Sequence, residues 1–363
     1  VAQISSAQRM KSVRGVHTVQ VASANSTSGQ SHTLVLGANG EVHTCGASSS
    51  GALGHGPDVR QSAPLLLRFS SQVPVKLVAA GARHSLLLTD TGRLYAMGDN
   101  THGQLGLESK HASYVDTPRS VEGPLGDEEV QVKLIAAGDS FTMAVTEDDR
   151  LYAWGANANG QLGLGKLSDQ VVPQEVPQLC GVKVCAINCG ACHSLAITEG
   201  GSKVWAWGSN VHGQLGLGMN GEGSQRVRPS LVPALSNRRG MLVCQASAAS
   251  NHSLVLTTTG EVYAFGENGH GQLGFPTVKS NTDAQTQHDN GDPLSQHQML
   301  QLQSMRERAK ARNKVEMDQP KLYENGVATL WLPTRVVTLS QYRVRAVVTG
   351  DMHTLTIAEH HHG

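Results

Sequence analysis

The chain has 363 residues, equal numbers of acidic and basic residues, 39% hydrophobic residues, 4% aromatic residues and 40 glycines. The zero net charge gives no reason to expect a nucleic-acid or membrane partner, and no apolar run is long enough to cross a bilayer. Many glycines with few aromatic residues predict an all-β protein in which short strands alternate with turns.

Linked segments recur along the chain and define a repeat. The first begins at a position that we call the anchor, which is histidine in five of six copies: His32, His84, Phe141, His193, His252 and His353. Successive anchors are 52, 57, 52, 59 and 101 residues apart. We expect the anchor histidines to be structural, with hydrogen bonds to the backbone, because a catalytic role shared among them would not survive Phe141.

Each repeat contains four strand-like segments. In one copy these are VKLVAAG (75–81), HSLLLT (84–89), RLYAMG (93–98) and TPRSV (117–121). The last contains a proline, as its counterparts do, and this suits an edge strand because proline cannot donate a ladder hydrogen bond. Four strands in a period of about 50 to 60 residues predict a β-propeller with one blade per repeat.

A Gly-rich segment follows the third strand of each repeat. Taken alone, NANGQLGLG (157–165) is typical of a phosphate-binding loop. It has counterparts in the other repeats, however, and each leads to a proline-containing strand instead of a helix N-terminus. We therefore predict structural turns with positive φ at Gly103, Gly106, Gly160, Gly163, Gly213, Gly216, Gly271 and Gly274.

These linked motifs resemble the repeat of the regulator of chromosome condensation (RCC) family over roughly residues 16–275 and 332–358. The resemblance implies a β-propeller of RCC-type repeats with four-stranded blades. Six blades can be counted from the anchors, whereas the family norm is seven. Three explanations would account for the difference. Residues 1–14 could supply the missing strands, the 101-residue interval could contain a degenerate blade, or the chain could be a fragment of a longer one. We expect a single domain over 1–363, closed by pairing of its N- and C-terminal strands.

Residues 276–331 interrupt the repeat as a polar, partly helical insertion. Its basic residues predict contact with a partner that has an acidic surface: Arg306, Arg308, Lys310 and Arg312. The alternative is an insertion tolerated in a surface loop, which costs little free energy. The run at residues 360–362 is typical of a purification-tag remnant, and we exclude it from functional reasoning.

The cysteines between Cys180 and Cys192 have a spacing that suggests zinc. Cys185, Cys189 and Cys192, however, occupy ordinary repeat positions along one strand and its turn, so they should not converge on a metal. We see no nucleophile elbow, P-loop or carboxylate pair, and we expect no enzyme, metal or cofactor. Free cysteines without a visible signal peptide predict an intracellular protein of the cytoplasm or nucleus, and the resemblance to the RCC family implies a eukaryotic one.

The two residues before each anchor vary between repeats. They fall at a turn between strands, and turns on a rigid scaffold build binding surfaces. From this set we select Arg83, Asp139, Ser140, Asn251, Asp351 and Met352 as candidate partner-binding residues. The alternative for each is a solvated turn without a partner. In the founding member of the family, loops on one face contact the GTPase Ran, and the resemblance makes Asp139 the residue most comparable with that site.

The resemblance implies a non-enzymatic protein-interaction scaffold, monomeric, and one domain of a larger regulatory protein such as a ubiquitin ligase. The alternative is a guanine-nucleotide exchange factor for a Ran-like small GTPase, although GANANGQLGLG (155–165) lacks the wedge insertion that such exchange uses. The tryptophan positions of a photoreceptor relative hold other residues here, which excludes light sensing: Ala82, Asp139, Ala191, Ser250 and Asp351. Zero net charge and the lack of a basic arm make nucleic acid an unfavourable partner.

Overall fold

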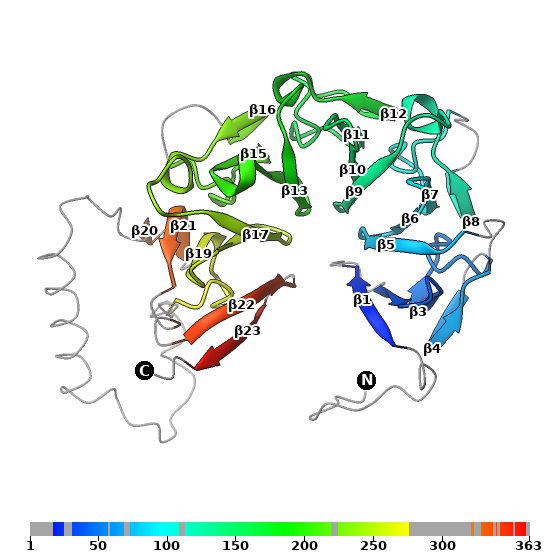
Figure 1. Ribbon diagram of the computed structural model, residues 1–363, viewed down its shortest axis with the longest axis horizontal. Helices are drawn as coiled ribbons and strands as arrows, with labels where there is room; N and C mark the ends of the chain where they lie inside the picture. Colours follow the sequence, from blue (N-terminus) through cyan, green and yellow to red (C-terminus); the bar gives the residue numbers. More distant parts are fainter. Residues whose placement is uncertain are drawn as a thin grey trace, which may run out of the picture.

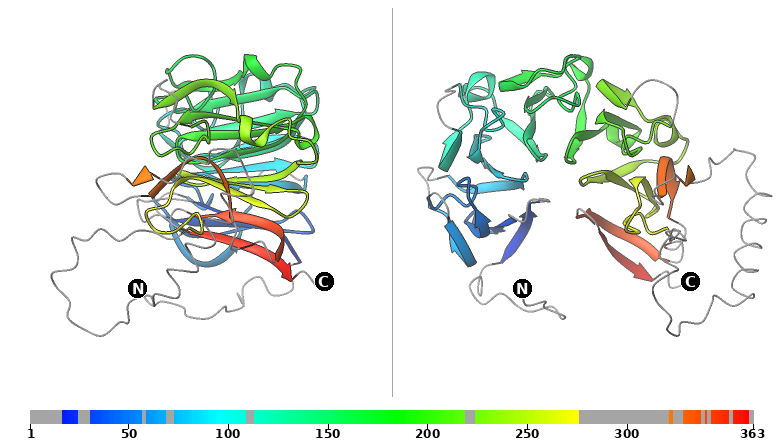
Figure 2. Two further views of the ribbon diagram at one scale, coloured as in Figure 1. Left: turned by 90° about the vertical axis from the view of Figure 1, so that its left-hand side faces the viewer. Right: turned by 180° about the vertical axis from the view of Figure 1, so that it is seen from behind.

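A computed structural model describes residues 17–24, 31–56, 59–68, 73–108, 113–218, 224–275, 321–322, 328–336, 339, 342–350 and 353–360. These residues form six antiparallel sheets, which are the blades of an open ring (Figure 1). Figure 2 shows the same open ring from behind. The predicted all-β propeller is confirmed. No helix in the described part of the chain has the length and apolar character that a membrane crossing requires.

The first four blades each contain four strands in sequential order, with the first strand innermost. Their strands are β1 (Thr18–Ser23), β2 (His32–Gly37), β3 (Val42–Ser48), β4 (Val59–Leu66), β5 (Val75–Ala80), β6 (His84–Thr89), β7 (Leu94–Asp99), β8 (Tyr114–Ser120), β9 (Val132–Ala137), β10 (Phe141–Thr146), β11 (Leu151–Gly155), β12 (Gln170–Glu175), β13 (Val184–Cys189), β14 (His193–Thr198), β15 (Lys203–Ser209) and β16 (Gln225–Leu231). The proline-containing strands β4, β8, β12 and β16 are outermost, as expected for strands that lack a donor.

The last two blades depart from four strands each. The fifth has five strands: β17 (Val243–Ala248), β18 (His252–Thr257), β19 (Val262–Glu267), β21 (Ala328–Arg335) and β20 (Lys321–Leu322). The sixth has two described strands, β22 (Tyr342–Thr349) and β23 (Thr354–His360). Because β21 pairs with β19, the long interval between anchors contains the next strand of the fifth blade, and none of its described residues forms an additional blade. The predicted insertion 276–331 overlaps β21, and its basic residues Arg306, Arg308, Lys310 and Arg312 lie outside the described residues.

The pairing that would close the ring is not shown. Among the described residues β1 pairs only with β2, and β22 only with β23, and Figure 1 shows these strands on opposite sides of an open sector. Residues 1–14, the predicted closing segment, lie outside the described residues. Leu355 and Ile357 of β23 are 64% and 67% exposed, although their counterparts in other blades, such as Leu86 and Leu88 of β6, are fully buried.

The hydrophobic core is divided among the junctions between blades. Five buried clusters each combine side chains of two neighbouring blades. Trp154 of β11 and Trp207 of β15 are the largest fully buried side chains. Each repeat therefore buries apolar surface mainly against its neighbours, as in other repeat proteins.

Candidate protein-interaction surface at the anchor turns

The Gly-rich segments are braced turns. The eight glycines of these turns have φ between +65° and +79°, a range that side-chain-bearing residues rarely adopt. In the third blade, the Asn157 Oδ1 atom accepts a hydrogen bond from the Leu162 amide (3.0 Å), and Gln161 Oε1 accepts one from the Asn159 amide (2.9 Å). The same two bonds recur in the second, fourth and fifth blades. Side chains of the turn itself therefore accept hydrogen bonds from its backbone amides. These amides are not free to bind a phosphate.

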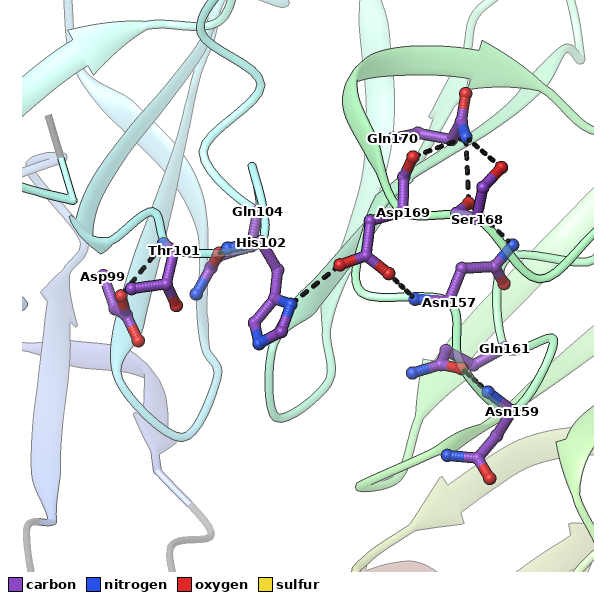
Figure 3. Close-up of polar contacts among 10 residues, drawn as sticks. All are labelled: Asp99, Thr101, His102, Gln104, Asn157, Asn159, Gln161, Ser168, Asp169 and Gln170. Atoms are coloured by element: carbon purple, nitrogen blue, oxygen red, sulfur yellow. Dashed lines mark hydrogen bonds and ion pairs between the residues drawn. The ribbon is translucent and has the colours of Figure 1, made fainter. Parts of the chain in front are cut away.

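Each Gly-rich turn also joins its blade to the next one. The Gln161 carbonyl accepts hydrogen bonds from Trp207 Nε1 (2.8 Å) and from Ser194 Oγ (2.8 Å), both in the fourth blade. Figure 3 shows a further link, in which His102 Nδ1 lies 2.8 Å from Asp169 Oδ2 of the third blade. These contacts fix the angle between blades, so the turns hold the surface loops in place.

The anchor histidines contribute to the same junctions. His193 Nε2 lies 2.9 Å from Ser253 Oγ of the next blade, and that hydroxyl donates to the Gln214 carbonyl (2.8 Å). The hydroxyl hydrogen is thus used, so the imidazole must carry its proton on Nε2. His32 and His84 contact Ser85 and Thr142 in the same way. The structural role was expected from the sequence with backbone partners, whereas Nε2 of these three histidines meets a side-chain hydroxyl of the next repeat.

Replacement of Gly103 by alanine should destabilise the fold much more than the same change at Gly271. Both occupy the first glycine of the repeat turn, at φ +79° and +77°. A Cβ at Gly103 would lie 2.5 Å from Val171 Cα in the next blade, whereas a Cβ at Gly271 meets no atom of the described residues within 4 Å. Alanine at positive φ costs about 1 kcal/mol at both sites, and the backbone clash adds about 1–3 kcal/mol at Gly103 alone. Urea denaturation of both variants measures the difference; equal losses would contradict the packing argument.

The anchor turns surround the centre of one face of the ring. A central depression is lined by turn residues from four blades, including Gly81, Ala82, Gly138, Asp139 and Ala191. These turns join the innermost strand to the second one. They therefore lie near the ring axis and not at the outer edge of the ring. Alanine and glycine make up most of this lining. Asp139 is the one charged side chain among its described residues.

The structure brings four of the six predicted residues to this face. The Arg83 side chain is 46% exposed, and its Nη1 lies 3.8 Å from Oδ2 of the buried Asp99. Asp139 and Ser140 are half-buried in the neighbouring turn, and Asn251 Nδ2 donates to Glu267 Oε2 (3.0 Å). The other two predicted residues, Asp351 and Met352, lie outside the described residues.

Sequence reasoning missed polar residues at the ends of the third strands and in the loops that follow them. These are Asp99, Glu267 and the His102–Asp169 pair. Asp99 and Glu267 are the last residues of β7 and β19, and the antiparallel pairing brings that end of each strand to the anchor turn. Cys192 lies here too: burial and the nearby Asp139 carboxylate raise the pKa of its thiol, which disfavours the reactive thiolate.

Comparisons with known proteins agree with this architecture. The sequence model of the RCC1-like domain family matches residues 4–304. The chain is 36% identical over 250 residues to the probable E3 ubiquitin-protein ligase HERC6 of Homo sapiens, covering 68% of this chain and 24% of that protein. It is 34% identical over 249 residues to the ultraviolet-B receptor UVR8 of Arabidopsis thaliana, covering 68% and 54%. The chain thus spans about half or less of these relatives.

Solved structures show the same fold. The crystal structure of Prp20p from Saccharomyces cerevisiae superposes with a TM-score of 0.70 at 20% identity, covering 96% of this chain and 71% of that chain. Human WBSCR16 gives a TM-score of 0.70 at 23% identity, covering 95% and 72%. The chain therefore belongs to the RCC1-like domain family, and the resemblance drawn from its repeats is confirmed.

Proposed function

We propose that this chain is a non-enzymatic interaction domain that binds a protein partner through its anchor turns. The proposal depends on the contrast, within one face, between repeated junctions and variable turn side chains. Hydrogen-bonded junctions repeat from blade to blade beneath the surface, whereas the turn side chains above them differ in charge and size, as Arg83 and Asp139 do. A rigid scaffold with variable turns is the usual construction of a binding surface.

The partner itself is proposed only by class. HERC6 and UVR8 are named a ubiquitin ligase and a receptor, and this chain matches only part of each. A regulatory or ubiquitin-pathway protein is the class that we propose. The six cysteines are free thiols, which supports a location in the cytoplasm or nucleus.

Affinity capture with quantitative mass spectrometry tests this surface. Wild type is compared with the double variant Arg83→Ala/Asp139→Ala and with Glu41→Ala, an exposed control in the turn between β2 and β3. Loss of a central contact costs about 2 kcal/mol, so the double variant should bind the captured protein roughly 30-fold more weakly. Equal binding by all three proteins would refute the site.

The same preparations also test guanine-nucleotide exchange. The loop after β11 contains the braced turn found in the other blades, and none of its described residues forms an added wedge. We therefore expect no faster release of a fluorescent guanine nucleotide from Ran. Acceleration that is lost in Arg83→Ala/Asp139→Ala would replace the scaffold proposal by exchange activity.

A further inference from the structure

The face opposite the anchor turns carries the turns between second and third strands and the connections between blades. We call it the connection face. Backbone hydrogen bonds tie these segments together: the Glu147 amide donates to the Gln131 carbonyl (2.8 Å), and the Thr258 amide donates to the Leu242 carbonyl (2.8 Å). The connections are therefore held by neighbouring turns, and their side chains form a defined surface.

A basic patch covers the fourth, fifth and sixth blades on this face. It consists of four exposed residues, Lys183, Arg238, Arg239 and Arg343. None of the four has an ion-pair partner in the described part of the chain. The nearby acids are already used, because Glu199 pairs with Lys203 (2.7 Å) and Glu261 pairs with Arg335 (2.9 Å).

Backbone contacts place two of these basic residues, Arg238 and Arg343, beside the turns of neighbouring blades. The Asn237 amide, next to Arg238, donates to the Ser202 carbonyl in the preceding blade (2.7 Å). The Val344 amide, next to Arg343, reaches the Gly260 carbonyl (3.4 Å). Arg238 and Arg343 thus lie on either side of the fifth blade. Their uncompensated charge creates a positive potential over that part of the face.

An acidic patch covers the junction of the second and third blades on the same face. Its four exposed residues are Asp127, Glu128, Glu129 and Glu147. Lys133 and Arg150 nearby pair with Asp149 and Asp148. Arg93 donates to the Gly126 and Asp127 carbonyls at the edge of the patch, so one positive charge faces four negative ones.

The two patches occupy equivalent places in different repeats. Residues 127–129 follow the short 3-10 turn η2 (Gly123–Gly126) between β8 and β9, and residues 238–239 follow η5 (Pro233–Leu235) between β16 and β17. In Figure 1 the third and fourth blades lie between these two connections. A twofold axis that lies in the connection face and bisects the two patches would place the basic patch of one copy over the acidic patch of the other, twice.

We propose that two copies of this chain associate face to face through their connection faces, with Arg238 and Arg239 of one copy opposite Glu128 and Glu129 of the other. This proposal is of a dimer, whereas a monomer was expected from the sequence. The proposed contact does not involve the anchor turns. Because the contacts are between exposed charges, association is electrostatic and sensitive to salt. A second copy is the partner that we propose, because its acidic patch complements the basic patch of the first copy. One symmetric contact then pairs both patches of each copy.

Sedimentation velocity tests the pair. Wild type at about 100 μM should form dimers in about 50 mM salt and bind roughly tenfold more weakly in about 0.5 M salt. Arg238→Glu/Arg239→Glu and Glu128→Arg/Glu129→Arg should each be monomeric, since like charges would then face each other. Mixed in equal amounts, the two variants should form a heterodimer, because reversed patches complement each other in both halves of the contact.

The mixture also controls for folding, since only folded variants restore association. Lys166→Glu, a charge reversal at an exposed residue of the loop between β11 and β12 on the opposite face, should dimerise like wild type. Monomeric wild type at low salt, or a mixture that remains monomeric, would overturn the proposal. Dimers that persist in both charge-reversed variants would show that a different surface associates.

Discussion

Acidification from pH 7.5 to pH 5 should remove several kcal/mol from the free energy of unfolding. Burial lowers the pKa of His84 and His193 to about 3, and of His32 and His252 to about 4. The unfolded chain titrates near 6.5, so below that pH it binds protons that the folded chain excludes. Stability is therefore fully present above pH 6.5 and is lost as the pH falls toward these lowered pKa values. At pH 5 each histidine contributes a loss of about 2 kcal/mol.

Urea denaturation at a series of pH values measures this effect, and one variant assigns it. Gln cannot be protonated but can still donate to Ser253 Oγ, so His193→Gln should reduce the pH dependence by about one histidine's share. His102→Gln changes an exposed imidazole at the junction of the second and third blades and serves as the control. Unfolding free energies that do not change between pH 7.5 and pH 5 would show that the buried histidines accept protons without cost.

The repeat could be predicted because its signals are local. Alternation of apolar residues, a proline in the outer strand and paired glycines in one turn each act within a few residues, so they appear directly in the sequence. Gly160 and Gly163 are examples: their spacing predicted the turn, and both have positive φ. The junctions could not be predicted in this way. The Ser253 hydroxyl that meets His193 lies one whole repeat later, and only the curvature of the ring brings the two together.

The candidate surfaces were predictable to different degrees. Arg83 and Asp139 precede anchors, so their common turn position was visible in the alignment of repeats, and the structure places both on one face. Asp99 became part of that surface only through its contact with Arg83. The charges at Glu128 and Arg238 are plain in the sequence, but their place on a common face depends on the direction of every strand between them.

Replacement of Trp207 by alanine should cost about 3–5 kcal/mol, the usual range for a large buried aromatic residue. The indole is completely buried, donates to the Gln161 carbonyl of the preceding blade (2.8 Å) and lies against Gly163. The substitution therefore leaves a cavity and removes a donor at the same junction. Trp207→Phe keeps most of the apolar contact and removes the hydrogen bond, so it should cost only about 1–2 kcal/mol.

Trp205 is the matched control on the same strand, β15. Its side chain is only half-buried, and its Nε1 donates to Thr198 Oγ1 within its own blade (3.0 Å). Trp205→Ala should therefore cost clearly less than Trp207→Ala in urea denaturation. In a repeat protein the coupling between neighbours determines whether the array unfolds as one unit. Trp207→Ala should accordingly broaden the transition more than Trp205→Ala does. A larger loss for Trp205→Ala would mean that the blades themselves, and not their junctions, hold most of the stability.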